Sequence, residues 1–217
     1  MIDIDDQVQA DVTHELKWEP SVDAANIGVS AEDGAVTLTG HVASYFAKTR
    51  AVRAAERVYA VRAVADEITV ELPSSYRHDD ASIAHAIAAN YEWNVAVPHD
   101  VEARVVDGWV TLEGTVDSNF EREAAERAVL YHAGVKGVTN LIEVKERVKS
   151  DDVEMRIDSA FRRSATLDAR GVHVTMNGGR AGLYGTVHSI AEMRAARHAA
   201  YAAPGVPSVE SHLIITP

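Results

Sequence analysis

The stretch Asp107-Gly108-Trp109-Val110-Thr111-Leu112-Glu113-Gly114-Thr115-Val116 decides the fold, because related stretches occur at two other places in the chain. One begins 74 residues earlier at Asp33, and the other begins 71 residues later at Gly178. The same offsets relate two further sets of apolar residues: Val64, Val138 and Val209; Ile68, Ile142 and Leu213. A register held over such distances indicates an internal repeat. We therefore predict three copies of one unit, at residues 1–72, 73–149 and 150–217.

Each repeated stretch is predicted to form a β-hairpin with the residues before it. Apolar and polar residues alternate over residues 27–31, 101–105 and 172–176, which is typical of a half-buried strand. The Asp-Gly or Gly-Gly pair that follows suits the positive φ angles of a tight turn. The second strand contains a glycine in every copy, Gly40, Gly114 and Gly185. A glycine inside a strand indicates a bulge or a close approach, and we expect a helix to lie over it.

Two helices complete each unit. The first follows a doubled acid (Asp5-Asp6, Asp79-Asp80, Asp151-Asp152), which suits a helix N-terminus. Its apolar stripe has helical spacing in every copy: Val8, Val12 and Leu16; Ile83, Ile87 and Tyr91; Val153, Ile157 and Phe161. The second helix is alanine-rich and is predicted over residues 44–60, 118–133 and 189–203, each beginning with a serine N-cap. A last strand is predicted over residues 67–72, 141–145 and 212–216.

The predicted fold class is therefore α+β. Each of the three repeated modules has the order α-β-β-α-β, with two helices packed on one face of a three-stranded mixed sheet. The linkers between copies are short, so neighbouring modules are expected to stay close together.

This pattern resembles the BON family, named for bacterial osmotically inducible and nodulation proteins. The resemblance covers all three copies and is most specific in two stretches, residues 107–116 and Gly134-Val135-Lys136-Gly137-Val138-Thr139-Asn140-Leu141-Ile142-Glu143-Val144. The third copy departs most, because Ala181 and Gly182 replace the Val and Thr of its second strand. The resemblance implies a role in stress response or envelope maintenance, through binding of phospholipid surfaces or partner proteins. It implies no enzymatic activity.

The composition narrows the choice of partners and location. The 217 residues include no cysteine, which excludes disulfides and thiolate chemistry, and the net charge of −12 argues against nucleic acid as a partner. No apolar run reaches the roughly 20 residues that a membrane-spanning helix needs. The N-terminus, Met1 to Asp6, is acidic where a secretory signal would be basic. We therefore expect a cytoplasmic protein with no transmembrane segment.

The sequence offers no arrangement typical of catalysis. None of the ten histidines falls at one position in all three copies, so partly packed or solvated histidines are a better interpretation than metal ligands. The glycine-rich residues 177–185 join two strands rather than a strand and a helix, so a turn is favoured over a phosphate-binding loop. We predict no enzymatic activity, no metal site and no cofactor.

Two sets of arginines are candidates for binding. Arg50, Arg53 and Arg57 form one stripe on the second helix of the first copy, and Arg194 and Arg197 form another in the third. The copies carry 6 basic and 13 acidic, 8 and 13, and 7 and 7 residues in turn, so the third copy is neutral. These arginines are either ordinary solvated side chains or a site for anionic headgroups or phosphate.

The sheet face that the helices leave open carries one aromatic residue in the second copy, Trp109, and one in the third, Tyr184. Because a module of about 70 residues buries only a modest core, we expect the copies to pack on one another. Both aromatics are therefore predicted at an interface between modules or with a partner. The alternative for Trp109 is an edge position half covered by its own loop.

Taken together, the residues and the resemblance predict a non-enzymatic, stress-associated binding or scaffold protein. Its three modules would be presented to phospholipid headgroups or to partner proteins. The alternative is a protein that senses a small ligand or cation at a site between modules.

Overall fold

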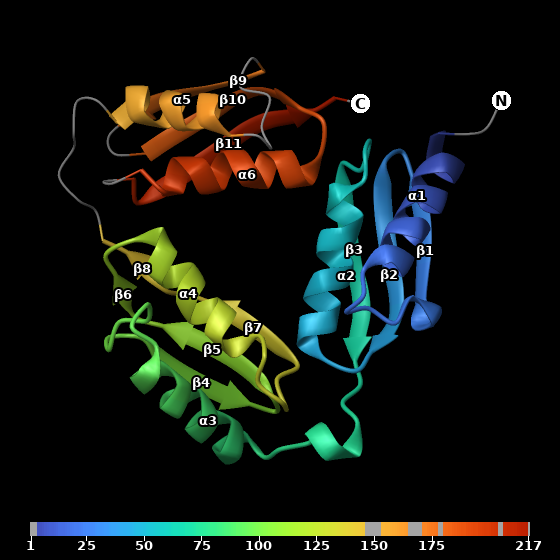
Figure 1. The fold of residues 1–217 in the computed structure, drawn as a ribbon, viewed down its shortest axis with the longest axis vertical. Helices are drawn as coiled ribbons and strands as arrows, with labels where there is room; N and C mark the ends of the chain where they lie inside the picture. Colours follow the sequence, from blue (N-terminus) through green and yellow to red (C-terminus); the bar gives the residue numbers. More distant parts are fainter. Residues whose placement is uncertain (1–3, 146–152, 165–170, 178–179, 204–205, 217) are drawn as a thin grey trace.

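The computed structural model describes residues 4–145, 153–164, 171–177, 180–203 and 206–216. These residues form three units with one element order (Figure 1). We call them module 1 (elements α1 to β3), module 2 (α3 to β8) and module 3 (α5 to β11). In each, two helices pack on one face of a three-stranded mixed sheet, and this confirms the predicted fold class.

The elements follow the same order in the three modules. Module 1 contains α1 (Ile4–Trp18), a 3-10 turn (Ala24–Asn26), β1 (Ile27–Glu32), β2 (Ala35–Val42), α2 (Tyr45–Arg57) and β3 (Ala63–Val70). After a 3-10 turn (Ser74–Tyr76), module 2 contains α3 (Asp80–Trp93), β4 (Glu102–Val106), β5 (Trp109–Glu113), β6 (Thr115–Val116), α4 (Asn119–Val129), β7 (Gly137–Asn140) and β8 (Glu143–Val144). Module 3 contains α5 (Val153–Arg163), β9 (Val172–Asn177), β10 (Arg180–Val187), α6 (Ile190–Tyr201) and β11 (Ser208–Ile215).

The second strand of each module is central in its sheet. In module 1, β2 pairs antiparallel with β1 and parallel with β3. The same pairing joins β5 to β4 and β7, and β10 to β9 and β11. In module 2 the central strand is interrupted at Gly114, and the parallel ladder resumes as the short pair β6 and β8.

The hairpin turns have the backbone that the sequence predicts. Asp33 and Gly34 have φ angles of 51° and 76°, and Asp107 and Gly108 have 52° and 78°. Two successive positive φ angles are the requirement of a tight two-residue hairpin turn. The equivalent Gly178-Gly179 and the doubled acid Asp151-Asp152 lie outside the described residues.

The strand glycines meet backbone rather than a helix. A Cβ at Gly40, where φ is +107°, would collide with the backbone oxygen of Asn26, just before β1. Gly114 and Gly185 meet the backbone oxygens of Asp100 and Gly171 in the same way. The prediction of a close approach is therefore confirmed, but the prediction that a helix lies over these glycines is wrong.

The doubled acids have two separate tasks. Asp79 is the N-cap of α3 and accepts a hydrogen bond from the Ser82 backbone N–H at 2.7 Å. The next residue, Asp80, accepts hydrogen bonds from the backbone N–H groups of Asp107 and Gly108, both at 2.8 Å. Asp5 binds the backbone of Asp33 and Gly34 in module 1 in the same way. The second task, which the sequence did not indicate, ties the first helix to the hairpin turn.

The serine caps of the second helices are confirmed, but the helices are shorter than predicted. Ser44, Ser118 and Ser189 each accept a hydrogen bond from a backbone N–H three residues later. The helices end at Arg57, Val129 and Tyr201, and the last strands begin at Ala63, Gly137 and Ser208. Both predicted boundaries were too late, because parallel pairing with the central strand starts at its first residue.

Neighbouring modules contact one another through α2, α4 and α6, which face the middle of the molecule in Figure 1. Tyr45, the first residue of α2, packs against the core of module 2, and Ile190, the first residue of α6, packs against the core of module 1. The rings of Phe46 and Tyr131 lie 4.9 Å apart between their centroids, and the Arg122 guanidinium lies 5.3 Å from the Tyr201 ring.

Candidate inter-module binding site

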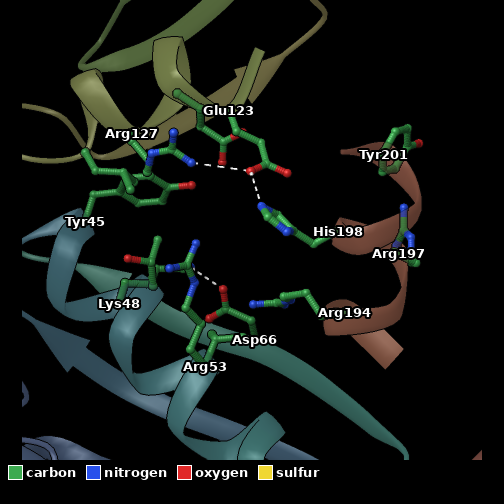
Figure 2. Close-up of a pocket in the computed structure, with 14 residues that line it drawn as sticks. Tyr45, Lys48, Arg53, Asp66, Glu123, Arg127, Arg194, Arg197, His198 and Tyr201 are labelled. Atoms are coloured by element: carbon green, nitrogen blue, oxygen red, sulfur yellow. Dashed lines mark hydrogen bonds and ion pairs between the residues drawn. The ribbon is translucent and has the colours of Figure 1, made fainter. Parts of the chain in front are cut away.

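A cavity of about 660 Å³ lies where the three modules meet, and its wall takes residues from all of them (Figure 2). Helix α2 contributes five residues, Tyr45, Lys48, Thr49, Val52 and Arg53, and β3 contributes Asp66. Module 2 contributes Glu123, Glu126, Arg127 and Leu130. Helix α6 contributes Arg194, Arg197, His198 and Tyr201. The cavity is thus a property of the assembled chain rather than of one module.

The wall is built from equivalent positions of the three second helices. Counted from the serine N-cap, the fifth, eighth and ninth residues line the cavity in every module. These residues are Thr49, Val52 and Arg53 in α2, Glu123, Glu126 and Arg127 in α4, and Arg194, Arg197 and His198 in α6. The three modules therefore turn the same face of the same helix toward one shared space.

Several charged side chains of the wall are already paired. Lys48 lies 3.2 Å from Asp66, and Arg127 lies 3.3 Å from Glu123. Two pairs cross between modules. Arg194 of module 3 lies 2.6 Å from Glu56 of module 1, and His198 of module 3 lies 3.7 Å from Glu123 of module 2. Acid–base pairs therefore help to define how the helices face one another.

Burial at this junction raises the pKa values of two acid groups. Burial raises the pKa of the Glu56 carboxyl, although the nearby Arg194 and Arg53 guanidinium groups act in the opposite direction. Burial also raises the pKa of the Tyr45 hydroxyl, and the neighbouring Glu126 carboxylate adds to this increase. Both groups lie where α2 meets another module, so the contact between modules adds to their partial shielding from water.

The structure places the five arginines that the sequence selected in two different surroundings. Arg53, Arg194 and Arg197 line the shared cavity. Arg50 and Arg57 instead face α1, where Arg50 lies 2.8 Å from Glu19 and Arg57 lies 2.8 Å from Glu15. Arg53 is rotated about 60° around the helix from Arg50, because each residue advances the helix by about 100°. The single stripe in the sequence therefore faces two different neighbours.

Trp109 and Tyr184 both lie on the open faces of their sheets. The Trp109 ring lies over Gly137, and its indole N–H donates to the Thr139 hydroxyl at 2.8 Å. The Tyr184 ring is stacked between His173 and His212, with centroid distances of 5.7 and 4.8 Å. These contacts stay within the residue's own module, whereas Phe46 and Tyr131 join two modules. A role of Trp109 and Tyr184 toward a partner remains a prediction.

The sequence analysis missed Lys48, Arg127, His198 and the two tyrosines of the wall, Tyr45 and Tyr201. A usable signal was present, because aligning the three second helices on their serine N-caps places Arg53, Arg127 and His198 at one position. That position is basic in all three copies. The residue types at the other two positions differ between copies, and this hides the shared face.

Two other observations concern the described part of the chain. It contains no group of three or more His, Asp or Glu side chains arranged to hold a metal ion. Among the same residues, no helix combines the length and the apolar character that crossing a bilayer requires.

The fold and the shared site define a protein of three α+β modules arranged in tandem. The BON domain model matches residues 4–71, 79–146 and 149–217, so the chain belongs to the BON domain family.

The chain is also similar to one characterised protein and to two solved structures. The chain is 29% identical over 146 residues to the osmotically-inducible protein Y of Escherichia coli (strain K12), a match that covers 65% of this chain and 73% of the relative. Two solved structures of CdsD, a structural protein of the type III secretion system of Chlamydia trachomatis, are 15% and 16% identical. They cover 97% and 100% of this chain and 93% and 99% of their own, at a TM-score of 0.27 each, which is too low for any argument about this chain.

Proposed function

We propose that the chain is a non-enzymatic, stress-associated scaffold that presents three BON modules, bounded at residues 1–72, 73–149 and 150–217, to phospholipid headgroups or partner proteins. Membership of the BON family and similarity to an osmotically inducible protein support this role. The observation that carries it is the convergence of equivalent helix faces from three modules on one shared surface. A partner that reaches this shared space contacts side chains of all three modules, so several weak contacts act together.

The charged groups of this surface favour binding over catalysis. The carboxylates of Asp66 and Glu123 are held in ion pairs with Lys48 and Arg127. A general base of an enzyme instead lies within hydrogen-bond reach of the group that it activates. Paired, partly exposed charges such as these are suited to exchanging one partner for another of the same sign.

The lipid part of this proposal can be tested by co-sedimentation with vesicles. Vesicles of phosphatidylglycerol and of phosphatidylcholine would be compared at low and at physiological ionic strength. We expect more binding to the anionic vesicles, with a decrease as salt is added. The triple variant Arg53→Gln, Arg194→Gln, Arg197→Gln should lose about 3 kcal/mol of binding free energy, at about 1 kcal/mol for each basic residue near an anionic surface.

A matched control keeps this test specific. Arg62, Arg104 and Arg163 are exposed, lie one in each module and do not line the shared cavity. The triple variant Arg62→Gln, Arg104→Gln, Arg163→Gln removes the same total charge. Equal binding to both vesicle types, or an equal decrease in both triple variants, would remove phospholipid from the proposal.

A second candidate function is supported by the cavity itself. Pockets for small ligands have volumes of roughly 300–1,000 Å³, and the cavity of about 660 Å³ between the modules falls in this range. This supports the proposal of a ligand-sensing protein with its site between modules. The wall carries more basic than acidic side chains, so it favours an anion over a cation. A thermal-shift comparison of phosphate compounds with divalent cations would separate the two: stabilisation by cations alone would contradict an anion site.

A further inference from the structure

The shared cavity is basic in a chain that is strongly acidic. Its wall contains five lysine and arginine side chains, Lys48, Arg53, Arg127, Arg194 and Arg197, and three carboxylates, Asp66, Glu123 and Glu126. Five positive and three negative charges leave a net charge of +2 in the wall, with His198 counted as neutral, and Glu56, which pairs with Arg194 from outside the wall, lowers it to +1. The whole chain has a net charge of −12. A local excess of positive charge against that background needs an explanation.

Within the described part of the chain, two of the five cations lack an ion pair. Lys48, Arg127 and Arg194 pair with Asp66, Glu123 and Glu56. Arg53 and Arg197 form no ion pair with the residues that the structure describes, and they come from two different modules. A bound anion would supply a counter-charge to each of them. Both side chains thus line the cavity without an ion-pair partner among the described residues, although the wall also holds the Glu126 carboxylate.

The type of cation indicates the type of anion. The planar guanidinium presents paired N–H groups that match the oxygens of phosphate, and such charge-assisted hydrogen bonds are short and strong. Four of the five cations are arginines. The cavity of about 660 Å³ has room for a molecule much larger than a bare phosphate. For comparison, one water molecule occupies about 30 Å³ in the liquid. Tyr45, Val52 and Leu130 give the wall an apolar part beside the charges.

We propose that the junction of the three modules binds a small soluble molecule that carries one or more phosphate groups. Arg53 and Arg197 are its first phosphate ligands, and Arg127 and His198, which occupy the Arg53 position in the other modules, contribute from the remaining two helices. Figure 2 shows these side chains on three separate helices around the cavity. The inference rests on the proposed binding role and names the ligand class of its inter-module site.

Binding at this site would also join the modules. Its ligands come from α2, α4 and α6, so a molecule held by all three helices binds the assembled arrangement better than a separated one. A ligand stabilises the state that it prefers in proportion to that difference in affinity. A phosphate compound should therefore reduce the distances between modules that scattering measures in solution, as well as bind.

The full chain can be tested by titration calorimetry with ADP, with adenosine as the probe that lacks phosphate. We expect ADP to bind and adenosine not to bind. The variant Arg53→Gln, Arg197→Gln should weaken ADP binding at least about tenfold, as expected for the loss of charge-assisted hydrogen bonds. The control variant Arg104→Gln, Arg163→Gln, which removes the same charge from exposed positions outside the cavity, should change it less than about twofold.

Phosphatidylglycerol vesicles distinguish a soluble ligand from a lipid headgroup. If the vesicles but not ADP respond to Arg53→Gln, Arg197→Gln, the soluble ligand is wrong and the proposed lipid-binding function stands. If ADP binds and the vesicles do not, the soluble ligand stands and the proposed lipid-binding function is wrong. Equal weakening in the control variant, binding of adenosine as tight as that of ADP, or no effect of either variant would overturn the site.

A folding defect would not hide the result. Arg53 and Arg197 are exposed, so the variants should melt at the temperature of the parent chain. If the glutamine variant melts earlier, Arg53→Lys, Arg197→Lys keeps both charges and removes the planar fork. ADP binding by this variant should fall between that of the parent and that of the glutamine variant, and binding equal to that of the glutamine variant would contradict the role of charge.

Discussion

The interiors of the modules and the cavity at the junction between them differ in the side chains that form them. Each module encloses its own apolar cluster, in which residues such as Leu38, Leu112 and Leu183 are completely buried. At the junction, aromatic contacts such as that of Phe46 with Tyr131 lie beside a cavity wall of mainly charged side chains, for example Arg194, whose side chain is 50% exposed. Apolar burial provides most of the free energy of folding, whereas exposed ion pairs contribute little. We therefore expect the modules to carry most of the stability and the junction to contribute little of it.

The two regions also differ in how they repeat. The core position of Leu38 is leucine in every module, but the junction position of Thr49 is Glu123 in module 2 and Arg194 in module 3. A core position must fill the same space in each copy. A junction position must instead fit a different neighbour, because the three helix faces meet one another. Divergence at this face is therefore what allows three copies to form one asymmetric site.

The largest effect is expected in a core. Leu112→Ala should cost about 2–5 kcal/mol, because it removes buried methyl groups and leaves a cavity. If the junction is weak, the loss should stay within module 2. Hydrogen exchange should then show reduced protection of β4, β5 and β7 with β2 and β10 unchanged.

The nearby Leu141→Ala is the matched control, because Leu141 is 55% exposed in the same module and should cost less than about 0.5 kcal/mol. Loss of protection in all three central strands of the Leu112 variant would show that the modules unfold together. The contrast between strong cores and a weak junction would then be wrong.

The cores were predictable from the sequence and the junction was not. The spacing of Val8, Val12 and Leu16 correctly identified a helix and its buried face, because period and burial are linked within one element. Element ends were less accurate. Val64 was recognised as a repeated position, but the last strand was predicted to begin only at Glu67, whereas β3 pairs with β2 from Ala63 onward.

The candidate site was predicted only in part. Arg53, Arg194 and Arg197 were selected as basic residues on second helices, and the structure brings all three to one cavity. Arg50 and Arg57 were selected by the same rule, yet they pair with α1. A helical stripe specifies which residues share a face but not which neighbour that face meets. This information comes from the tertiary arrangement.

A smaller effect is expected where a polar contact lies inside a module. Asp5 accepts hydrogen bonds from the backbone N–H groups of Asp33 and Gly34 at 2.9 and 3.2 Å. Asp5→Ala leaves these two groups without their carboxylate partner and should cost about 1–2 kcal/mol. The neighbouring Asp6→Ala removes the same charge from an exposed position of the same helix turn, so the two variants share any dipole effect. Urea unfolding measures the difference, and equal midpoints would mean that the tie to the hairpin contributes nothing.

The smallest effect is expected at the junction, where burial raises the pKa of Glu56 above its ordinary value of 4.5. A raised pKa in the folded state means that folding favours the protonated carboxyl. Its contribution to stability is present below about pH 4.5 and is lost as the pH rises through the folded-state value. Glu56→Gln should therefore raise the stability slightly at neutral pH, by less than about 1 kcal/mol because Arg194 is half exposed. Below the ordinary pKa the two proteins should melt alike.

Melting curves of the parent and Glu56→Gln chains at neutral and at acidic pH decide this point. A variant that melts earlier at neutral pH would mean that the Arg194–Glu56 ion pair stabilises the junction by more than the burial of its carboxylate costs. The junction would then be a source of stability in its own right. If instead the variant melts slightly later while scattering shows the modules further apart, the ion pair orients the modules without stabilising them. That outcome is the one expected if the proposed ligand replaces contacts between the modules.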